Sequence, residues 1–151
     1  MPVTMEQVRV ALEPDEPDYA QARQLGPEAL PHLREIVAGR DPMLASKATY
    51  LAALIAAEGS ADVVSQAAQS PDPVLRVAAA GAARNLPPQD ASDILVELVA
   101  DDDVGVRKVA LTSSSPEATA ELQERIQHVS QNDAAPRIRE LAAEALERMR
   151  H

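Results

Sequence analysis

The chain has 151 residues, a formal net charge of −10, no Cys, Trp or Phe, and two Tyr. This length suits one domain, and the lack of Cys excludes disulfides and thiol chemistry. The acidic excess disfavours phosphate backbones and anionic membrane surfaces, and no apolar run approaches the ~18–20 residues of a membrane-spanning helix. With no signal peptide visible, we expect a cytoplasmic protein without nucleic-acid or membrane partners.

Residues 1–25 precede the regular part of the chain. Their apolar periodicity predicts two short helices, roughly Thr4–Leu12 and Asp18–Leu25. We expect these two helices to form a cap at the N-terminal end of the structure that follows.

Beyond the cap, one short segment occurs four times. Each copy begins with Asp or Ala, and apolar and basic positions follow. The copies are Asp41-Pro42-Met43-Leu44-Ala45, Asp72-Pro73-Val74-Leu75-Arg76, Asp103-Val104-Gly105-Val106-Arg107 and Ala135-Pro136-Arg137-Ile138-Arg139. Their starts lie 31, 31 and 32 residues apart. A fixed period in this range is typical of stacked repeats.

Each copy has the chemistry of a helix start. Asp41, Asp72 and Asp103 can accept hydrogen bonds from the free N–H groups of a first turn, and their charge suits the helix dipole. A Pro directly after the start fits the first helical position, where a missing N–H costs nothing.

An amphipathic stretch precedes each copy, so the repeating unit is a helix A, a turn and a helix B. The predicted A stretches cover residues 29–37, 61–68, 93–100 and 116–129. The predicted helix-pair repeats cover residues 26–56, 60–87, 90–114 and 115–150. A pair this short cannot bury its apolar face alone, so neighbouring pairs must stack.

Two stretches connect this unit with a known family. One is Leu25-Gly26-Pro27-Glu28-Ala29-Leu30-Pro31-His32-Leu33, and the other is the Asp-Pro-x-(Val/Leu)-Arg-x-x-Ala-Ala pattern at 72–80. Over residues 26–149 the chain resembles HEAT repeats, especially the short bacterial and archaeal HEAT-like repeats also found in phycobilin lyases. It departs from the pattern at Ala45, where the family has Arg, and at Ala135, where it has Asp.

The resemblance and the period together predict the fold class. We expect an all-α protein, built as the right-handed α-α superhelix of a HEAT-like solenoid, with about four helix pairs behind the N-terminal cap. A core of Ala, Leu, Val and Ile without aromatic rings favours helices that approach one another closely.

Charged side chains recur at fixed spacing around the B-helix starts. Asp72 and Arg76 lie four residues apart, and Asp103 and Arg107 repeat this spacing one unit later. The pattern indicates helix caps and an ion-pair ladder along the stack, in which Arg139 pairs with an acid of a neighbour.

No group of side chains has the pattern of a catalytic, cofactor or metal site. The run 101–103 of three Asp indicates a capping turn rather than a cation site. His32, His128 and His151 are isolated from one another, and no Cys accompanies them. The cluster Ser113–Ser115 has no Gly-x-Ser-x-Gly setting. We therefore expect a protein that is not an enzyme.

The B helices of such a stack form its concave wall, and equal positions in successive units align in rows. The residues expected on this wall are Met43, Ser46, Tyr50, Val74, Val77, Arg84, Lys108 and Thr112. Tyr50 has two interpretations: an exposed anchor for a partner, because aromatic side chains dominate interface energies, or a ring that packs on the next repeat over Gly81.

The function predicted first is a non-enzymatic interaction scaffold that binds a protein or peptide on this wall. The alternative is an enzyme or enzyme subunit with HEAT repeats, of the chromophore-lyase or DNA-glycosylase kind, and it rests on analogy of fold. A base-flipping enzyme needs aromatic stacking and a basic groove, whereas this chain is acidic and has no Trp or Phe. The oligomeric state and the identity of the partner stay open.

Overall fold

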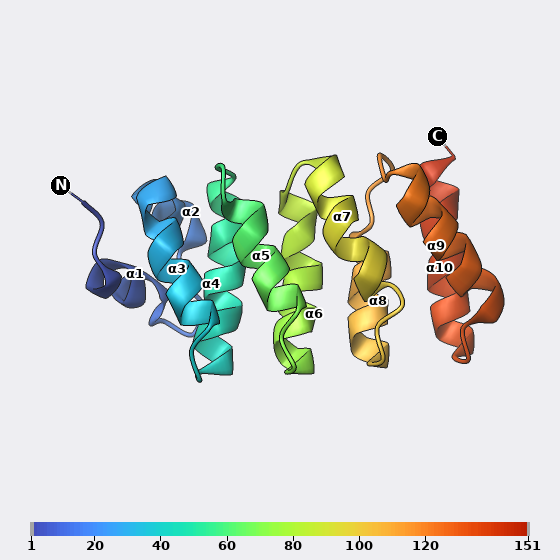
Figure 1. Cartoon of the computed structure of the whole chain (residues 1–151), viewed down its shortest axis with the longest axis horizontal. Coiled ribbons are helices and arrows are strands. Elements are labelled where there is room, and N and C mark those ends of the chain that lie inside the picture. Colours follow the sequence, from blue (N-terminus) through green and yellow to red (C-terminus); the bar gives the residue numbers. More distant parts are fainter. Residues whose placement is uncertain (1, 151) are drawn as a thin grey trace.

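The computed structural model describes residues 2–150 of the chain. Within this range every regular element is a helix, and the helices stand side by side in a row that runs from the N-terminal to the C-terminal end (Figure 1). One layer holds the first helix of each repeat, and a second layer behind it holds the second helix. The predicted all-α solenoid is confirmed.

The two layers are named after the order of the helices within a repeat. The A helices are α3 (Leu30–Val37), α5 (Ser60–Ala68), α7 (Pro88–Leu98) and α9 (Ala120–Asn132). The B helices are α4 (Pro42–Ile55), α6 (Pro73–Ala82), α8 (Val104–Ser113) and α10 (Pro136–Met149). The N-terminal segment forms α1 (Met5–Leu12) and α2 (Tyr19–Ala22), and short 3-10 turns cover Arg23–Leu25, Pro27–Ala29 and Ala83–Asn85. Each B helix packs against the next B helix, and each A helix packs against the next A helix.

Aspartate side chains start three of the four B helices, as their sequence predicts. The Asp41 carboxylate accepts hydrogen bonds from the amides of Met43 and Leu44, both at 3.1 Å. Asp72 and Asp103 cap α6 and α8 in the same way. These bonds satisfy amides that have no partner inside the helix.

Two A helices begin at other residues than predicted. Helix α7 starts at Pro88 rather than Asp93, because a Pro at the first helical position needs no hydrogen bond on its missing N–H. Helix α9 starts at Ala120 rather than Pro116, since the Thr119 hydroxyl accepts a bond from the Leu122 amide at 3.3 Å and caps the helix there.

The core follows the row of helices instead of filling a central ball. Fully buried alanines occur along the B helices, among them Ala48, Ala52, Ala79, Ala80 and Ala110. Larger buried side chains include Leu33, Leu51, Leu95, Leu111 and Ile126. Because each repeat contacts mainly its neighbours, the stability of the stack is close to a sum of repeat and interface terms.

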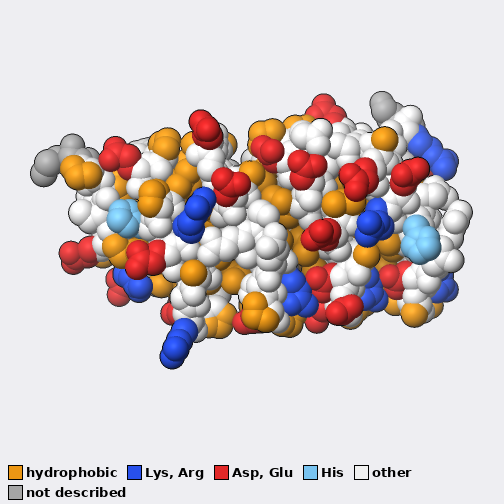
Figure 2. Space-filling view, viewed as in Figure 1, with side chains coloured by type: hydrophobic (Ala, Val, Ile, Leu, Met, Phe, Trp, Pro, Cys, Tyr) orange, Lys and Arg blue, Asp and Glu red, His pale blue; other side chains and the backbone are white. Residues whose placement is uncertain are grey.

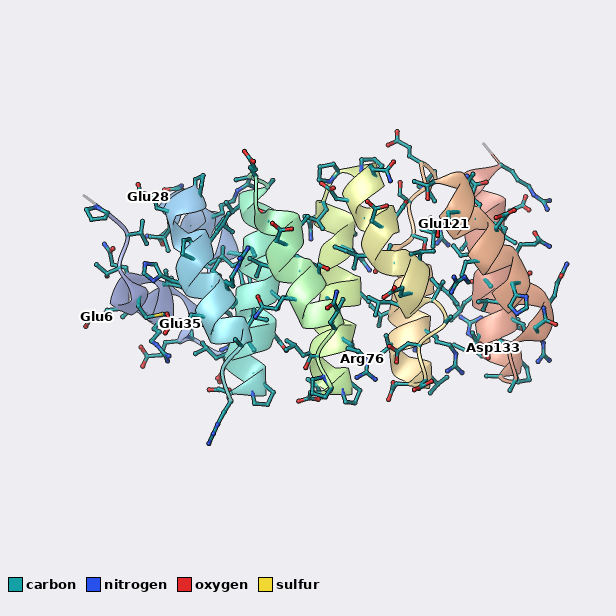
Figure 3. The ribbon with its side chains drawn as sticks, in the orientation of Figure 1. Glu6, Glu28, Glu35, Arg76, Glu121 and Asp133 are labelled. Carbon is teal, nitrogen blue, oxygen red and sulfur yellow. The ribbon has the colours of Figure 1, made fainter. Side chains whose placement is uncertain are left out.

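An ion-pair ladder links the second repeat to the third and the third to the fourth, along the edge where A helices end and B helices begin. Figure 3 labels one member of each pair, Arg76 and Asp133. Arg76 donates from Nε to Asp101 Oδ2 at 2.9 Å and from Nη2 to Asp101 Oδ1 at 3.1 Å. One repeat later, Arg107 Nε lies 2.9 Å from Asp133 Oδ2, and Arg107 Nη2 donates to Asp133 Oδ1 at 3.4 Å. Each arginine therefore binds the A–B turn of the following repeat.

Arg76 and Arg107 do not pair with the aspartates four residues before them. Asp72 and Asp103 instead use their carboxylates to cap their own helices. The Arg76 and Asp101 side chains are only 18% and 11% exposed. The hydrogen bond to Asp101 raises the pKa of Arg76 above its usual value. A cation whose pKa is higher in the folded than in the unfolded chain stabilises the fold fully at every pH below its pKa in the unfolded chain. The contribution of Arg76 is therefore complete at neutral pH and disappears only in strong alkali.

Side chains from the first repeat hold the N-terminal segment in place. Lys47 Nζ donates to the carbonyl oxygens of Leu12 at 3.1 Å and Pro14 at 2.7 Å, which lie at the end of α1. His32 Nε2 lies 2.8 Å from the carbonyl oxygen of Val3. The segment therefore covers the N-terminal end of the stack through specific polar contacts.

Ala56 ends α4 in the left-handed region, with φ 53°, where a Cβ is unfavourable. We expect Ala56→Gly to raise the free energy of unfolding by about 0.5–1 kcal/mol, because relief of this strain exceeds the added entropy of the unfolded chain. Urea unfolding followed by circular dichroism measures the change. Ala57→Gly, one residue further along, is the control, and an equal effect of both substitutions would contradict the assignment to backbone strain.

Candidate protein-binding surface

The side of the B helices that faces away from the A helices is called the B face below. Most of the large exposed apolar side chains of the described residues belong to these helices. Met43, Val74 and Val104 lie in the first turns of α4, α6 and α8 and are 66%, 58% and 53% exposed. Tyr50 on α4 is 37% exposed, and Val10 on α1 is 59% exposed. Because four of these five large side chains belong to B helices, this face has the composition of an interaction surface.

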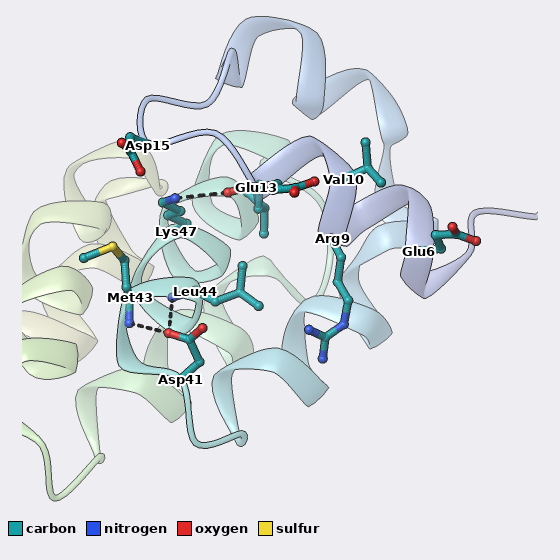
Figure 4. Close-up of a pocket in the computed structure, with 10 residues that line it drawn as sticks. Glu6, Arg9, Val10, Glu13, Asp15, Asp41, Met43, Leu44 and Lys47 are labelled. Carbon is teal, nitrogen blue, oxygen red and sulfur yellow. Dashed lines mark hydrogen bonds between the residues drawn. The ribbon is translucent and has the colours of Figure 1, made fainter.

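A pocket of about 480 Å³ lies where α1 meets α4, at the N-terminal end of the B face (Figure 4). Val10, Met43 and Leu44 supply its apolar lining. The charged residues around it are Glu6, Arg9, Glu13, Asp15, Asp41 and Lys47. Lys47 already donates to the backbone oxygens of Leu12 and Pro14, and Figure 4 draws the first of these bonds as a dashed line, so the charge left for a ligand is mainly acidic.

The two tyrosines of the chain form one aromatic pair beside α4. The ring of Tyr50 meets the ring of Tyr19 edge to face, with centroids 4.7 Å apart and planes at 78°. Burial, together with the neighbouring Tyr50, raises the pKa of Tyr19. The packing of Tyr50 over Gly81 is not observed, because Val109 is the side chain nearest to where a Cβ of Gly81 would lie, at 3.8 Å.

The other residues predicted for the wall are spread over three helices and one 3-10 turn. Ser46 and Thr112 donate to carbonyl oxygens of their own helices, at 2.8 and 3.1 Å. Val77 is half-buried against the core. Arg84 is exposed, but its Nη2 donates to Ser113 Oγ at 3.0 Å in the following repeat. Lys108 is exposed on α8.

The two ends of the B face differ in character. On α10, Arg137 forms exposed ion pairs with Glu140 at 3.1 Å and with Glu144 at 3.8 Å, whereas α4 and α6 carry Met43 and Val74 at the corresponding rows. The face is thus apolar and aromatic at its N-terminal half and charged at its C-terminal half.

The opposite face of the molecule, formed by the A helices, is acidic (Figure 2). Its acidic residues are Glu35, Asp62, Asp90, Asp93, Glu97, Glu121 and Glu124. Arg34 and Arg125 are the basic residues of these four helices. This surface suits contact with solvent, and the B face is the better candidate for an interface.

Sequence reasoning missed the partner of Tyr50 and the exposure of Val104. The positions of Tyr19 and Tyr50 differ by 31, the period of the repeat, so the rule that aligned the rows would have placed Tyr19 one unit before Tyr50. Val104 replaces the Pro of the repeat pattern, and its exposure follows from its place in the first turn.

Among the described residues, no three His, Asp or Glu side chains gather in a way that could hold a metal ion. His151, one of the three histidines considered above, lies outside the described residues. In the part of the chain that the structure covers, the helices are too short or too polar to traverse a lipid bilayer.

Comparison with known proteins identifies the fold family. A family model for HEAT repeats matches residues 30–115, so the chain belongs to the HEAT-repeat family. A chain in the structure of the CpcE–CpcF complex of phycocyanin lyase from Nostoc sp. PCC7120 is similar, with a TM-score of 0.71 and 21% identity, over 93% of this chain and 96% of that chain. Comparison with curated protein sequences found no significant match.

The structural match corrects the expectation that the protein is not an enzyme. Phycocyanin lyase is an enzyme, and a chain of its complex has this fold over nearly its whole length. The expectation was wrong because it rested on missing nucleophile–base and metal patterns, which exclude only the reactions that need those groups.

Proposed function

We propose that the chain is a protein-binding subunit of a lyase-type HEAT-repeat complex, and that it binds its protein partner on the B face. The main support is the gathering of exposed apolar side chains on the B helices, at Met43, Tyr50, Val74 and Val104. Support for a complex comes from the similar solved structure, which contains two different proteins, CpcE and CpcF.

The composition of the B face indicates which side chains the partner presents to it. The pocket beside α4 accepts an apolar side chain, and the acids around it favour a neighbouring Lys or Arg. The row from Met43 to Val74 extends the apolar contact across two helices. Because these helices are held by a packed core, the surface is formed before binding, and little conformational entropy is lost on association.

Introducing negative charges on the B face tests the proposal. We expect Met43→Glu with Val74→Glu to reduce recovery of the partner at least tenfold, because two carboxylates would be buried against apolar groups. Both positions are exposed, so the unfolding midpoint should stay within about 2 °C. Ala100→Glu with Gln69→Glu adds the same charge on the A side and is the control.

The measurement is photo-crosslinking from position 108, an exposed position on α8 that none of the variants changes, in the native cell, followed by quantitative mass spectrometry. Loss of one specific crosslinked protein in the B-face variant, with unchanged recovery in the control, is the expected result. Equal recovery in all three proteins would remove the B face as the binding surface.

The similarity to phycocyanin lyase also favours a second function, chromophore handling, for the same complex. Addition of a linear tetrapyrrole to the purified chain, alone and with the captured partner, tests it. A changed absorption spectrum that the B-face substitutions abolish would support this function, and an unchanged spectrum in both samples would exclude it.

A further inference from the structure

The ladder between repeats follows a simple positional rule. The arginine lies four residues after the start of a B helix segment, and the aspartate lies two residues before the next such start. Arg76 with Asp101 and Arg107 with Asp133 obey it. At the interface between the first and second repeats, both members of the pair are absent. Ala45 stands where the rule has Arg, and Ser70 stands where it has Asp.

Arg139 occupies the ladder-arginine position in the last repeat. It makes the bond to the backbone of its own turn that the other two arginines make, but not, among the described residues, the ion pair. Arg76 and Arg107 each donate from Nη1 to a carbonyl oxygen of their own turn, at 2.9 Å to Ser70 and to Asp101. Arg139 Nη1 likewise donates to the Asp133 carbonyl oxygen, at 2.6 Å. No carboxylate of the described residues forms an ion pair with Arg139.

A stripe beside this arginine is also open only in the last repeat. Eight and eleven residues after each B-segment start lie small or apolar side chains that the next B helix covers. In the first three repeats these are Thr49 and Ala52, Ala80 and Ala83, and Leu111 and Ser114, none more than 4% exposed. In α10 the corresponding Ala143 is exposed and Leu146 is half-buried.

The remaining part of this end surface is polar and hollow. On α9, Gln123 and Gln127 occupy positions equivalent to the buried Ala91 and Leu95 of α7. A cavity of about 410 Å³ lies between them and Leu146. Such a surface is compatible with water and with a partner, as in non-obligate interfaces.

We infer that this C-terminal end surface binds a helix-pair repeat of a partner protein, with an Asp in its A–B turn that pairs with Arg139. The partner's Asp would bind Arg139 in the way that Asp101 binds Arg76 and Asp133 binds Arg107. A B helix of the partner would pack alongside α10 and cover Ala143 and Leu146. A second copy of this chain does not fit, because its first turn has Gly39 at the aspartate position and the exposed cation Arg40 next to it.

The probe is a fifth repeat, a copy of residues 115–150 joined after Arg150, whose turn carries the copy of Asp133. Because the chain has no Cys, Ala143→Cys introduces a single thiol on the stripe. We expect Ellman's reagent to modify this thiol at least tenfold more slowly in the extended chain than in the chain without the extension. Arg139→Ala, or Asn at the copied aspartate, should restore at least half of the original rate.

Arg137→Ala is the matched control, since Arg137 is on the same helix but points to exposed acids, and it should leave the protection unchanged. A second extension, a copy of residues 87–115 with the copied Asp101, guards against failure of one segment. Equal thiol reactivity in the unextended chain and in both extended chains would overturn the inference, as would protection that survives Arg139→Ala. The two copied segments fold on α8 and on α6 within the structure, so failure of both to protect the thiol counts against the end surface itself.

Discussion

Arg107→Ala is expected to lower the free energy of unfolding by about 2–4 kcal/mol, close to the loss measured when one partner of a buried ion pair is removed. The Asp133 side chain is 8% exposed, and without Arg107 its charge would lose the guanidinium 2.9 Å away. The substitution also removes the bond from Arg107 Nη1 to the Asp101 carbonyl oxygen, at 2.9 Å. Urea unfolding followed by circular dichroism measures the change.

A double-mutant cycle separates the ion pair from these other bonds. Asp133→Asn keeps an oxygen that can accept from the Ala135 amide, as Asp133 does at 2.9 Å. We expect the Arg107→Ala and Asp133→Asn losses to be less than additive by about 1–3 kcal/mol. Arg137→Ala breaks pairs that are about 60% exposed and should cost less than ~1 kcal/mol. Equal losses for Arg107→Ala and Arg137→Ala would show that the ladder does not hold the repeats together.

Leu95→Ala is expected to lower the free energy of unfolding by about 2–5 kcal/mol, because it removes buried methyl groups and leaves a cavity. Leu95 is fully buried in α7, which packs against α5, α6, α8 and α9. The neighbours can relax only partly, since they are themselves packed on further repeats. Val104→Ala, on an exposed side chain, is the control and should change stability by less than about 0.5 kcal/mol.

Hydrogen exchange of the Leu95→Ala protein tests how the repeats are coupled. In a stack with nearest-neighbour interactions, amides of α5 to α9 should exchange faster, while those of α3, which packs on α4 and α5, should change less. A uniform increase over all helices would instead indicate that the whole chain unfolds as one cooperative unit.

Local chemistry was enough to predict the helices and their order. Asp41, Asp72 and Asp103 cap the helices that their sequence positions indicate, because a cap needs only a side chain and the amides two or three residues later. The period of about 31 residues predicted the stack, since a short amphipathic pair must be covered by a similar neighbour. The all-α class follows from these two features, whereas the resemblance to HEAT repeats rested on residues 25–33 and on the pattern at 72–80.

Contacts between repeats needed the tertiary structure. Arg76 has acids at several sequence distances, and only the placement of α6 beside the next A–B turn selects Asp101 over Asp72. The pairing of Tyr50 with Tyr19 rather than over Gly81 depends on how the N-terminal segment docks on α4. Neither the motifs nor the composition could predict whether the protein belongs to an enzyme, because a similar helical stack occurs in the complex of an enzyme.

The amino-acid sequence by itself determined which residues form helices, where most of them begin, and that they repeat. The tertiary structure decided which charges pair, which small side chains are covered, and which face keeps Met43, Val74 and Val104 exposed. The physical reason is distance along the chain: caps and periodicity act over a few residues, whereas ladder partners are 25 or 26 residues apart and meet only when two repeats stack.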